Sequence, residues 1–328
     1  MLRFGIIGAG RIAHVHARSI SQHADAKLIA ITDPVAEAAT NLAEQYDVAI
    51  AANAEELFAN PDIDAIIVCS PTPLHIEHIV GATRAGKAVL CEKPIAMESS
   101  ALTALDEGLE GYNARVMMGF NRRFDPNFAR VHELVDKGEI GEVEQLTIIS
   151  RDPAAPPKEY IAVSGGIFKD MTIHDFDMAR FFLGDIKEVT AIGQNLDPEL
   201  ADTGDFDAAI IVLKNAEGKA ATIINNRHCA TGYDQRLEAS GPEGSIFADN
   251  VRETTVRLSR DHFSDSLDPY LDFFLERYEA AYYRELDAFI RAVEETGDYT
   301  PSIADGIAAL TIAEAAAESA QTGATVSL

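Results

Sequence analysis

The chain has 328 residues, 47% of them hydrophobic and 24% charged, which are ordinary values for a globular protein of about two domains. It has 27 lysines and arginines against 53 aspartates and glutamates, so the formal net charge is -26. A field of this sign repels phosphate backbones and anionic lipid headgroups, and no basic cluster reverses it locally. The composition therefore argues against nucleic-acid and membrane partners.

The cysteines and histidines give no sign of a disulfide framework or a metal site. Only Cys69, Cys91 and Cys229 are present, without the spacing of a zinc knuckle. The pairs His14/His16 and His75/His78 lack further ligands at metal-binding spacing. Neither a signal peptide nor a stretch of transmembrane length is recognisable. We therefore expect a cytoplasmic protein that needs no metal.

The first 120 residues alternate between short apolar runs and segments long enough for crossover helices. The expected strands are Phe4–Ile7, Leu28–Ile31, Ala65–Val68, Ala88–Leu90 and Val116–Met118. This rhythm is typical of a parallel sheet with helices on both faces. It predicts a doubly wound α/β domain over residues 1–120.

A glycine motif follows the first expected strand directly and opens a helix. In Gly8-Ala9-Gly10-Arg11-Ile12-Ala13, the first glycine permits a tight turn and the second lets the backbone approach a pyrophosphate. Asp33 ends the second expected strand, where a carboxylate can bind ribose hydroxyls and repel a 2′-phosphate. The motif favours NAD over NADP. The alternative is a structural glycine turn with Asp33 as a helix N-cap.

Beyond residue 120, strands follow one another with hairpin signals, which predicts an α+β domain over residues 121–328 with a mainly antiparallel open sheet. The expected strands are Glu142–Ser150, Ile186–Gln194, Asp207–Lys214, Lys219–Asn225, Arg236–Ser240 and Thr254–Leu258. Two long helices are expected, at 269–295 and at 303–320. Whether the last one packs back on the first domain stays open.

Two segments carry candidate catalytic residues. Cys91-Glu92-Lys93-Pro94 follows the fourth apolar run of the parallel sheet's pattern, at the sheet edge where ligands bind in this architecture. In the segment from Gly165 to Arg180, Asp170 and His174 are one helical turn apart, so both fall on one helix face. Taken alone, Lys93 could be a solvated lysine in a turn, and the Asp170/His174 pair could be a helix cap.

The chain resembles the Gfo/Idh/MocA oxidoreductases along essentially its whole length. The resemblance rests on the glycine motif, Glu92-Lys93-Pro94 and the Asp170/His174 helix, which occur in the expected order. The resemblance is closest to the inositol 2-dehydrogenase branch, through 119–125, 150–153 and 165–180. It implies a Rossmann domain, NAD as cofactor and a homotetramer formed through the second domain's sheet.

The resemblance also implies roles for individual residues. Lys93, Asp170 and His174 would form the catalytic group, and Arg123, Asp152 and Tyr233 would contact the substrate. The expected cofactor-binding residues are Gly8, Gly10, Arg11, Ile12, Asp33, Ser70, Thr72, His75, Glu92 and Lys93. Glu92 and Pro94 would shape the nicotinamide end through a cis Lys93–Pro94 bond.

The implied reaction is oxidation of one secondary hydroxyl of an unphosphorylated cyclic polyol, with conversion of myo-inositol to scyllo-inosose the first choice, as a step of polyol catabolism. Some relatives carry Asn where this chain has Asp152, so scyllo-inositol and an aldopyranose such as glucose stay open as substrates. A non-catalytic NAD-responsive binding protein is the alternative from another class.

Overall fold

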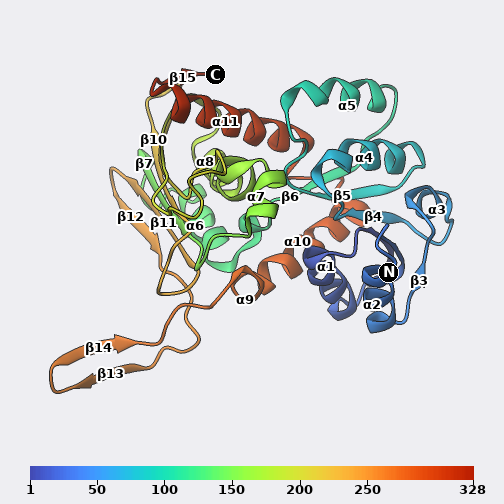
Figure 1. Cartoon of the computed structure of the whole chain (residues 1–328), viewed down its shortest axis with the longest axis horizontal. Coiled ribbons are helices and arrows are strands. Elements are labelled where there is room, and N and C mark those ends of the chain that lie inside the picture. Colours follow the sequence, from blue (N-terminus) through green and yellow to red (C-terminus); the bar gives the residue numbers. More distant parts are fainter. The chain divides into compact units, whose positions relative to one another are not determined.

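The computed structural model describes all residues from 1 to 328, which divide into two compact units. The first unit comprises Met1–Phe124 and Ala280–Leu310 and contains a six-stranded parallel sheet in the order β3-β2-β1-β4-β5-β6 (Figure 1). Its strands are β1 (Leu2–Ile7), β2 (Ala26–Thr32), β3 (Ala49–Ile50), β4 (Ala65–Val68), β5 (Ala88–Glu92) and β6 (Val116–Gly119). All five strand pairs are parallel, which confirms the predicted doubly wound sheet.

The helices of the first unit come from two distant parts of the chain. They are α1 (Arg11–Gln22), α2 (Ala36–Tyr46), α3 (Ala54–Ala59), η1 (Thr72–Leu74), α4 (His75–Arg84), η2 (Ser99–Ala101), α5 (Leu102–Leu109), η3 (Asn121–Phe124), α10 (Glu279–Arg291) and η5 (Ala292–Thr296). The last long helix, α11 (Ile303–Thr322), contributes to this unit as far as Leu310.

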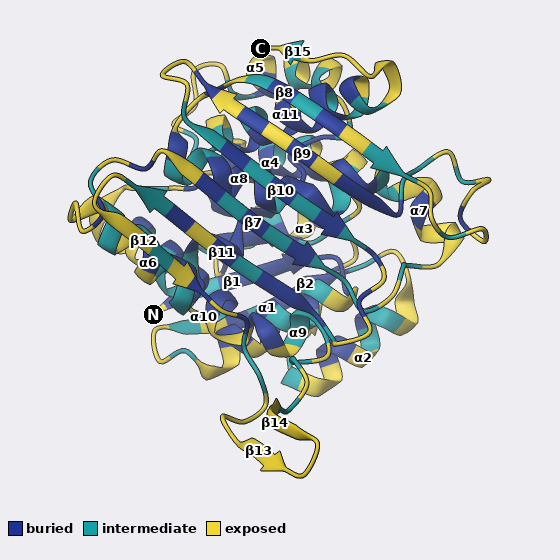
Figure 2. Ribbon diagram, turned by 90° about the vertical axis from the view of Figure 1, so that its left-hand side faces the viewer, coloured by how far each residue is buried: buried dark blue, intermediate teal, exposed yellow.

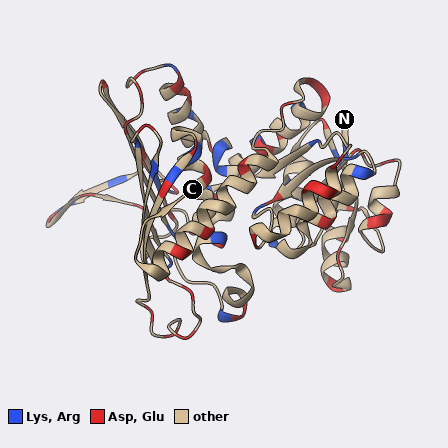
Figure 3. Ribbon diagram, turned by 90° about the horizontal axis from the view of Figure 1, so that it is seen from above, with Lys and Arg blue, Asp and Glu red and all other residues tan.

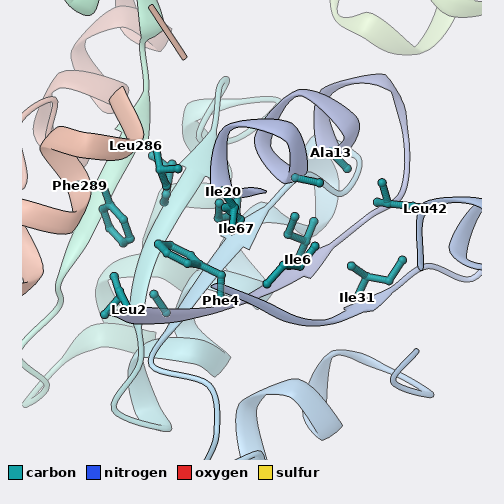
Figure 4. Close-up of a cluster of buried hydrophobic side chains, with 14 of the residues drawn as sticks. Leu2, Phe4, Ile6, Ala13, Ile20, Ile31, Leu42, Ile67, Leu286 and Phe289 are labelled. Atoms are coloured by element: carbon teal, nitrogen blue, oxygen red, sulfur yellow. The ribbon is translucent and has the colours of Figure 1, made fainter. Parts of the chain in front are cut away.

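The core of the first unit lies between the sheet, α1 and α10. Phe4 and Ile67 are fully buried on the strands, and Leu286 and Phe289 come from α10 (Figure 4). The rings of Phe4 and Phe289 are 6.2 Å apart between centroids. Burial of a side chain of this size stabilises a fold by about 1.5–3 kcal/mol, so α10 is an integral part of the unit.

The second unit comprises Asp125–Glu279 and Thr311–Leu328 and contains a seven-stranded sheet in the order β12-β11-β7-β10-β9-β8-β15. Its strands are β7 (Gln145–Arg151), β8 (Ile186–Gln194), β9 (Ala208–Asn215), β10 (Ala220–Asn226), β11 (Asp234–Gly241), β12 (Gly244–Ala248) and β15 (Val326–Ser327). Only β7 and β10 pair in parallel, so the predicted mainly antiparallel sheet is confirmed with one exception.

Buried and exposed residues alternate along the strands of this sheet, as Figure 2 shows for β9. The helices of the unit are α6 (Pro126–Asp136), α7 (Lys158–Ser164), η4 (Phe168–Thr172), α8 (Ile173–Leu183) and α9 (Phe274–Arg277). Helix α8 packs on β7 and β10, and its apolar residues Phe176, Ala179 and Leu183 are all buried. A separate ribbon of β13 (Arg257–Arg260) and β14 (Phe263–Leu267) is almost entirely exposed. The strand expected at Thr254–Leu258 is therefore wrong, because the chain forms a strand only from Arg257 and this strand pairs with β14 instead of joining the sheet.

Two expectations about helices were wrong in detail. The segment 269–295 is not one helix, because Phe273 is extended, with φ -148 and ψ 177, and Tyr278 separates α9 from α10. The run that carries Asp170 and His174 is not a regular α-helix either, since Asp170 lies in the π-helical turn η4 and His174 in the first turn of α8.

The distribution of charged side chains agrees with the acidic composition of the chain. Figure 3 shows Asp and Glu distributed over helices and loops of the chain. None of the helices combines the length and the apolar character that a membrane crossing requires.

Candidate functional site

The glycine motif forms a loop with room for a phosphate group. Gly8 has φ +100, and a Cβ there would lie 2.5 Å from the carbonyl oxygen of Cys69. Gly10 is the N-cap of α1, and a Cβ added to it would meet no atom within 4 Å. The helix that starts here has no acidic residue in its first turn. Open space beside a helix N-terminus fits the pyrophosphate of a dinucleotide, with Arg11 and Ile12 supplying the first helical amides.

Asp33 fixes this loop to the end of β2. Its Oδ2 accepts a hydrogen bond from the amide of Ala9 at 2.7 Å, and its Oδ1 accepts one from the amide of Val35 at 2.7 Å. The carboxylate is half-buried, and residues 32–36 include no Lys or Arg that could neutralise a 2′-phosphate. These features fit the ribose end of NAD.

His75 connects the loops that follow β4 and β5. Its Nδ1 lies 2.7 Å from the carbonyl oxygen of Pro94, and its Nε2 lies 2.8 Å from that of Ser70. Burial lowers the pKa of His75, although the two carbonyls act in the opposite direction. The Ser70 hydroxyl contacts Nδ1 of His78 at 2.8 Å, and Thr72 begins η1. The imidazole of His75 therefore contacts protein carbonyls through both ring nitrogens.

Glu92 and Lys93 lie where β5 ends. The Glu92 carboxylate is buried, with Oε1 2.8 Å from Nε2 of His16. Its other oxygen lies so close to Gly119 that a Cβ there would be only 3.1 Å away. Lys93 is half-buried, and the Lys93–Pro94 peptide bond is cis, as the resemblance implied.

Two residues around Glu92 were missed by the sequence reasoning. His16 lies on α1, and Glu285 lies on α10 with 0% exposure and no hydrogen-bond partner for either carboxylate oxygen. Burial, and next the charge of Glu92, raise the pKa of Glu285 well above its ordinary value. His16 was visible only as part of a histidine pair without metal spacing, and Glu285 gave no signal beyond a charged residue in a helical pattern.

In the second unit, Asp170 and His174 lie on one continuous helical run. The Asp170 carboxylate accepts a hydrogen bond from the Tyr160 hydroxyl at 2.9 Å and one from the Arg227 guanidinium at 3.3 Å. The His174 ring is half-buried in the first turn of α8. A carboxylate one helical turn from an imidazole is an arrangement that can move a proton to or from a ligand.

The expected substrate residues occupy defined positions in their own units. In the first unit, Nη2 of Arg123 lies 3.0 Å from Oδ1 of Asp305. Burial would raise the pKa of Asp305, but Arg123 and Ser302 lower it to about 2. In the second unit, Asp152 is half-buried after β7, and the buried ring of Tyr233 packs edge-on against Phe273 and Tyr278.

The first unit is the cofactor-binding part of an NAD-dependent oxidoreductase, because its doubly wound sheet carries a glycine loop, Asp33 and a helix N-terminus that fit a dinucleotide. Residues 2–120 match the model of the oxidoreductase family with an NAD-binding Rossmann fold, and residues 128–247 match the GFO/IDH/MocA C-terminal domain. The chain belongs to the GFO/IDH/MocA oxidoreductase family. This confirms the resemblance and NAD as the cofactor.

Named relatives cover nearly the whole chain. It is 45% identical to an inositol 2-dehydrogenase of Rhizobium meliloti, over 97% of this chain and 96% of that protein. It is 44% identical to a myo-inositol 2-dehydrogenase of Thermotoga maritima, with the same coverage. Among solved structures, a myo-inositol dehydrogenase from Corynebacterium glutamicum superposes with a TM-score of 0.96 at 49% identity, covering 100% of this chain and 99% of that one.

Proposed function

We propose that this chain oxidises one secondary hydroxyl of an unphosphorylated cyclic polyol with NAD, converting myo-inositol to 2-keto-myo-inositol. The observation that carries the proposal is the pair Asp170 and His174, held on one helical run in a chain that is 45% identical to a protein named inositol 2-dehydrogenase. All three relatives reported above carry inositol in their names.

The proposal gives each catalytic residue one task. His174 accepts the proton of the reacting hydroxyl, because an imidazole titrates near neutral pH. Asp170 orients the imidazole and stabilises its charged form. Lys93 donates a hydrogen bond to the reacting oxygen as negative charge develops on it. NAD, when bound, accepts the hydride from the same carbon.

Further residues hold the cofactor and the substrate. Gly8, Gly10, Arg11 and Ile12 surround the pyrophosphate and Asp33 binds the adenosine ribose. The loops with Ser70, Thr72, His75 and Glu92 shape the nicotinamide end, and His75 does so by linking the carbonyls of Ser70 and Pro94. Arg123, Asp152 and Tyr233 bind the hydroxyls of the ring.

The charge of the chain supports an uncharged substrate. A sugar phosphate is usually held by several cations, whereas Arg123 already pairs with Asp305 at 3.0 Å and the net charge is -26. We therefore assign the site to a polyol without phosphate groups.

We also propose how the chain is organised and assembled. Residues 1–120 bind NAD, and residues 121–328 bind the substrate and form a homotetramer through the outer face of the sheet. On that face Ile192, Ile210 and Val212 are 60%, 40% and 43% exposed, which is unusual for strand residues of a sheet that stays in water. Light scattering on wild type and Ile210→Glu tests the tetramer.

We place the protein in the cytoplasm, because its three free cysteines fit a reducing compartment.

Turnover with a substrate panel tests the proposed reaction. Purified protein is incubated with NAD and myo-inositol, scyllo-inositol, glucose or an inositol phosphate, and NADH formation is followed. We expect the highest kcat/KM with myo-inositol and none with the phosphate. Tight NAD binding without NADH from any polyol would instead identify a non-catalytic NAD-responsive protein.

A further inference from the structure

Arg227 is a buried arginine that no part of the proposed reaction uses so far. It follows β10 directly and its side chain is 1% exposed. Its guanidinium is shared between two carboxylates, with Nη1 2.9 Å from Oδ2 of Asp205 and Nη2 3.3 Å from Oδ2 of Asp170. A cation that is fully removed from water needs such partners, so the three side chains form one charged cluster.

The cluster is anchored on both sides. The amide of Arg227 donates to the carbonyl of Asp207 at 2.8 Å, and Oδ1 of Asp205 accepts from the amide of Ile167 at 2.9 Å. Gly166, beside Ile167, must be glycine here, because its φ is +81 and a Cβ would lie 2.7 Å from Oδ1 of Asp205. The backbone that precedes η4 therefore leaves room for the Asp205 carboxylate and donates a hydrogen bond to it.

A second residue of the same strand end also holds the catalytic run. Asn225, two residues before Arg227, accepts a hydrogen bond from the Thr172 hydroxyl at 2.6 Å and donates one to the buried Asp175 at 2.9 Å. The end of β10 thus contacts the run at Asp170, Thr172 and Asp175, on both sides of the junction between η4 and α8. This junction is the point where a π-turn replaces regular helical geometry.

We infer that Arg227 is a positioning residue for the reaction, which holds the Asp170 carboxylate in a fixed orientation while Asp170 orients His174. The inference rests on the proposed function. The guanidinium offers N–H donors in a fixed planar arrangement, so it holds the carboxylate of Asp170 on one side and that of Asp205 on the other. A rotated Asp170 could no longer orient the imidazole of His174, although substrate and NAD would still bind.

The test compares Arg227→Gln with Asp205→Asn, because each breaks one side of the same cluster. Asparagine at 205 keeps the oxygen that accepts from the amide of Ile167 but loses the ion pair with Arg227. We expect Arg227→Gln to lower kcat about 10²-fold with the KM for NAD unchanged. Arg227→Lys should recover part of the loss, while Asp205→Asn should reduce kcat far less. Arg180→Gln, which breaks the ion pair of Arg180 on α8 with Asp185 beyond the end of that helix, is the control.

The outcomes separate this inference from the proposed function. Equal losses of kcat in Arg227→Gln and Asp205→Asn, or an unchanged kcat in Arg227→Gln, would overturn the positioning role. No turnover by wild type with any polyol would remove the proposed function instead. A crystal structure of Arg227→Gln then decides the remaining point: we expect the Asp170 carboxylate to be displaced, and an Asp170 in its present place would show that Arg227 does not hold it.

Discussion

The Nε2 atom of His16 on α1 lies 2.8 Å from Oε1 of Glu92 at the end of β5, and both side chains are buried. Helix α1 begins at the glycine loop, and Glu92 directly precedes Lys93. The contact therefore ties the phosphate end of the cofactor site to the lysine loop within one unit. A shift of α1 would be transmitted to Lys93 through this pair.

The pKa of Glu285 predicts how stability depends on pH. The folded-state pKa is raised by burial and by Glu92, so the contribution of this carboxyl is fully present below its unfolded pKa and is lost as the pH rises through the folded value. Each tenfold difference in proton affinity is worth about 1.4 kcal/mol. Glu285→Gln should therefore be more stable than wild type at neutral pH and equal to it near pH ~4. Urea unfolding of both proteins across this pH range measures the difference in unfolding free energy. A difference that does not change with pH would contradict the raised pKa of Glu285.

Removal of His174 should stop chemistry without loss of the cofactor. Because the imidazole is assigned to proton transfer, we expect His174→Ala to lower kcat by about 10²- to 10⁴-fold. The Kd for NAD, measured by fluorescence titration, should stay within about twofold. His262→Asn, in the exposed ribbon, is a control that removes an imidazole and suits the positive φ of 77 at this position. Near-normal turnover in His174→Ala would exclude the residue from the mechanism.

Asp33 should control the choice between NAD and NADP. We expect Asp33→Ala to reduce the ratio of kcat/KM for NAD over NADP by about tenfold, a change of about 1.4 kcal/mol. It should also raise the KM for NAD, because the amides of Ala9 and Val35 lose their acceptor. Asp33→Asn keeps an acceptor and should show the smaller rise in KM. An unchanged cofactor ratio in both variants would refute the ribose assignment.

The two motif glycines should fail in different ways when changed to alanine. In Gly8→Ala the new Cβ meets the Cys69 carbonyl at 2.5 Å and the backbone is strained, so we expect a loss of about 1–3 kcal/mol in unfolding free energy. In Gly10→Ala the Cβ enters open space, so stability should hold while NAD affinity falls. Calorimetry and NAD titration of both variants check this. Equal Tm losses would show that Gly10 is structural.

Local patterns predicted the parts of the fold that depend on neighbours in sequence. Most strands of the two sheets and the glycine loop have clear signals, because apolar runs and glycine at positive φ are local requirements. Strands β12 and β15 of the second sheet were not predicted. Strand β3 has only two residues, Ala49 and Ile50, both exposed, and leaves no such pattern. The break in the expected helix at Phe273 was also missed, because no glycine or proline lies beside it.

Features that depend on distant contacts could not be predicted. Arg227 meets Asp170 from a position 57 residues away, and nothing around it in the sequence marks a buried cation. Glu285 is buried beside a strand that ends at residue 92, and its helical pattern looks like any half-exposed helix. Side chains of this kind are identified by the tertiary fold alone.

The placement of α10 has a consequence for the order in which the protein can form during synthesis. Phe4 and Ile67 pack against Leu286 and Phe289, so the first sheet lacks one wall of its core until residue 290 has left the ribosome. All strands of the second sheet except β15 are made in the meantime. During synthesis the first sheet therefore keeps an apolar face uncovered until α10, which lies more than half the chain beyond Phe4, has been made. The dinucleotide domain cannot be completed as an amino-terminal fragment.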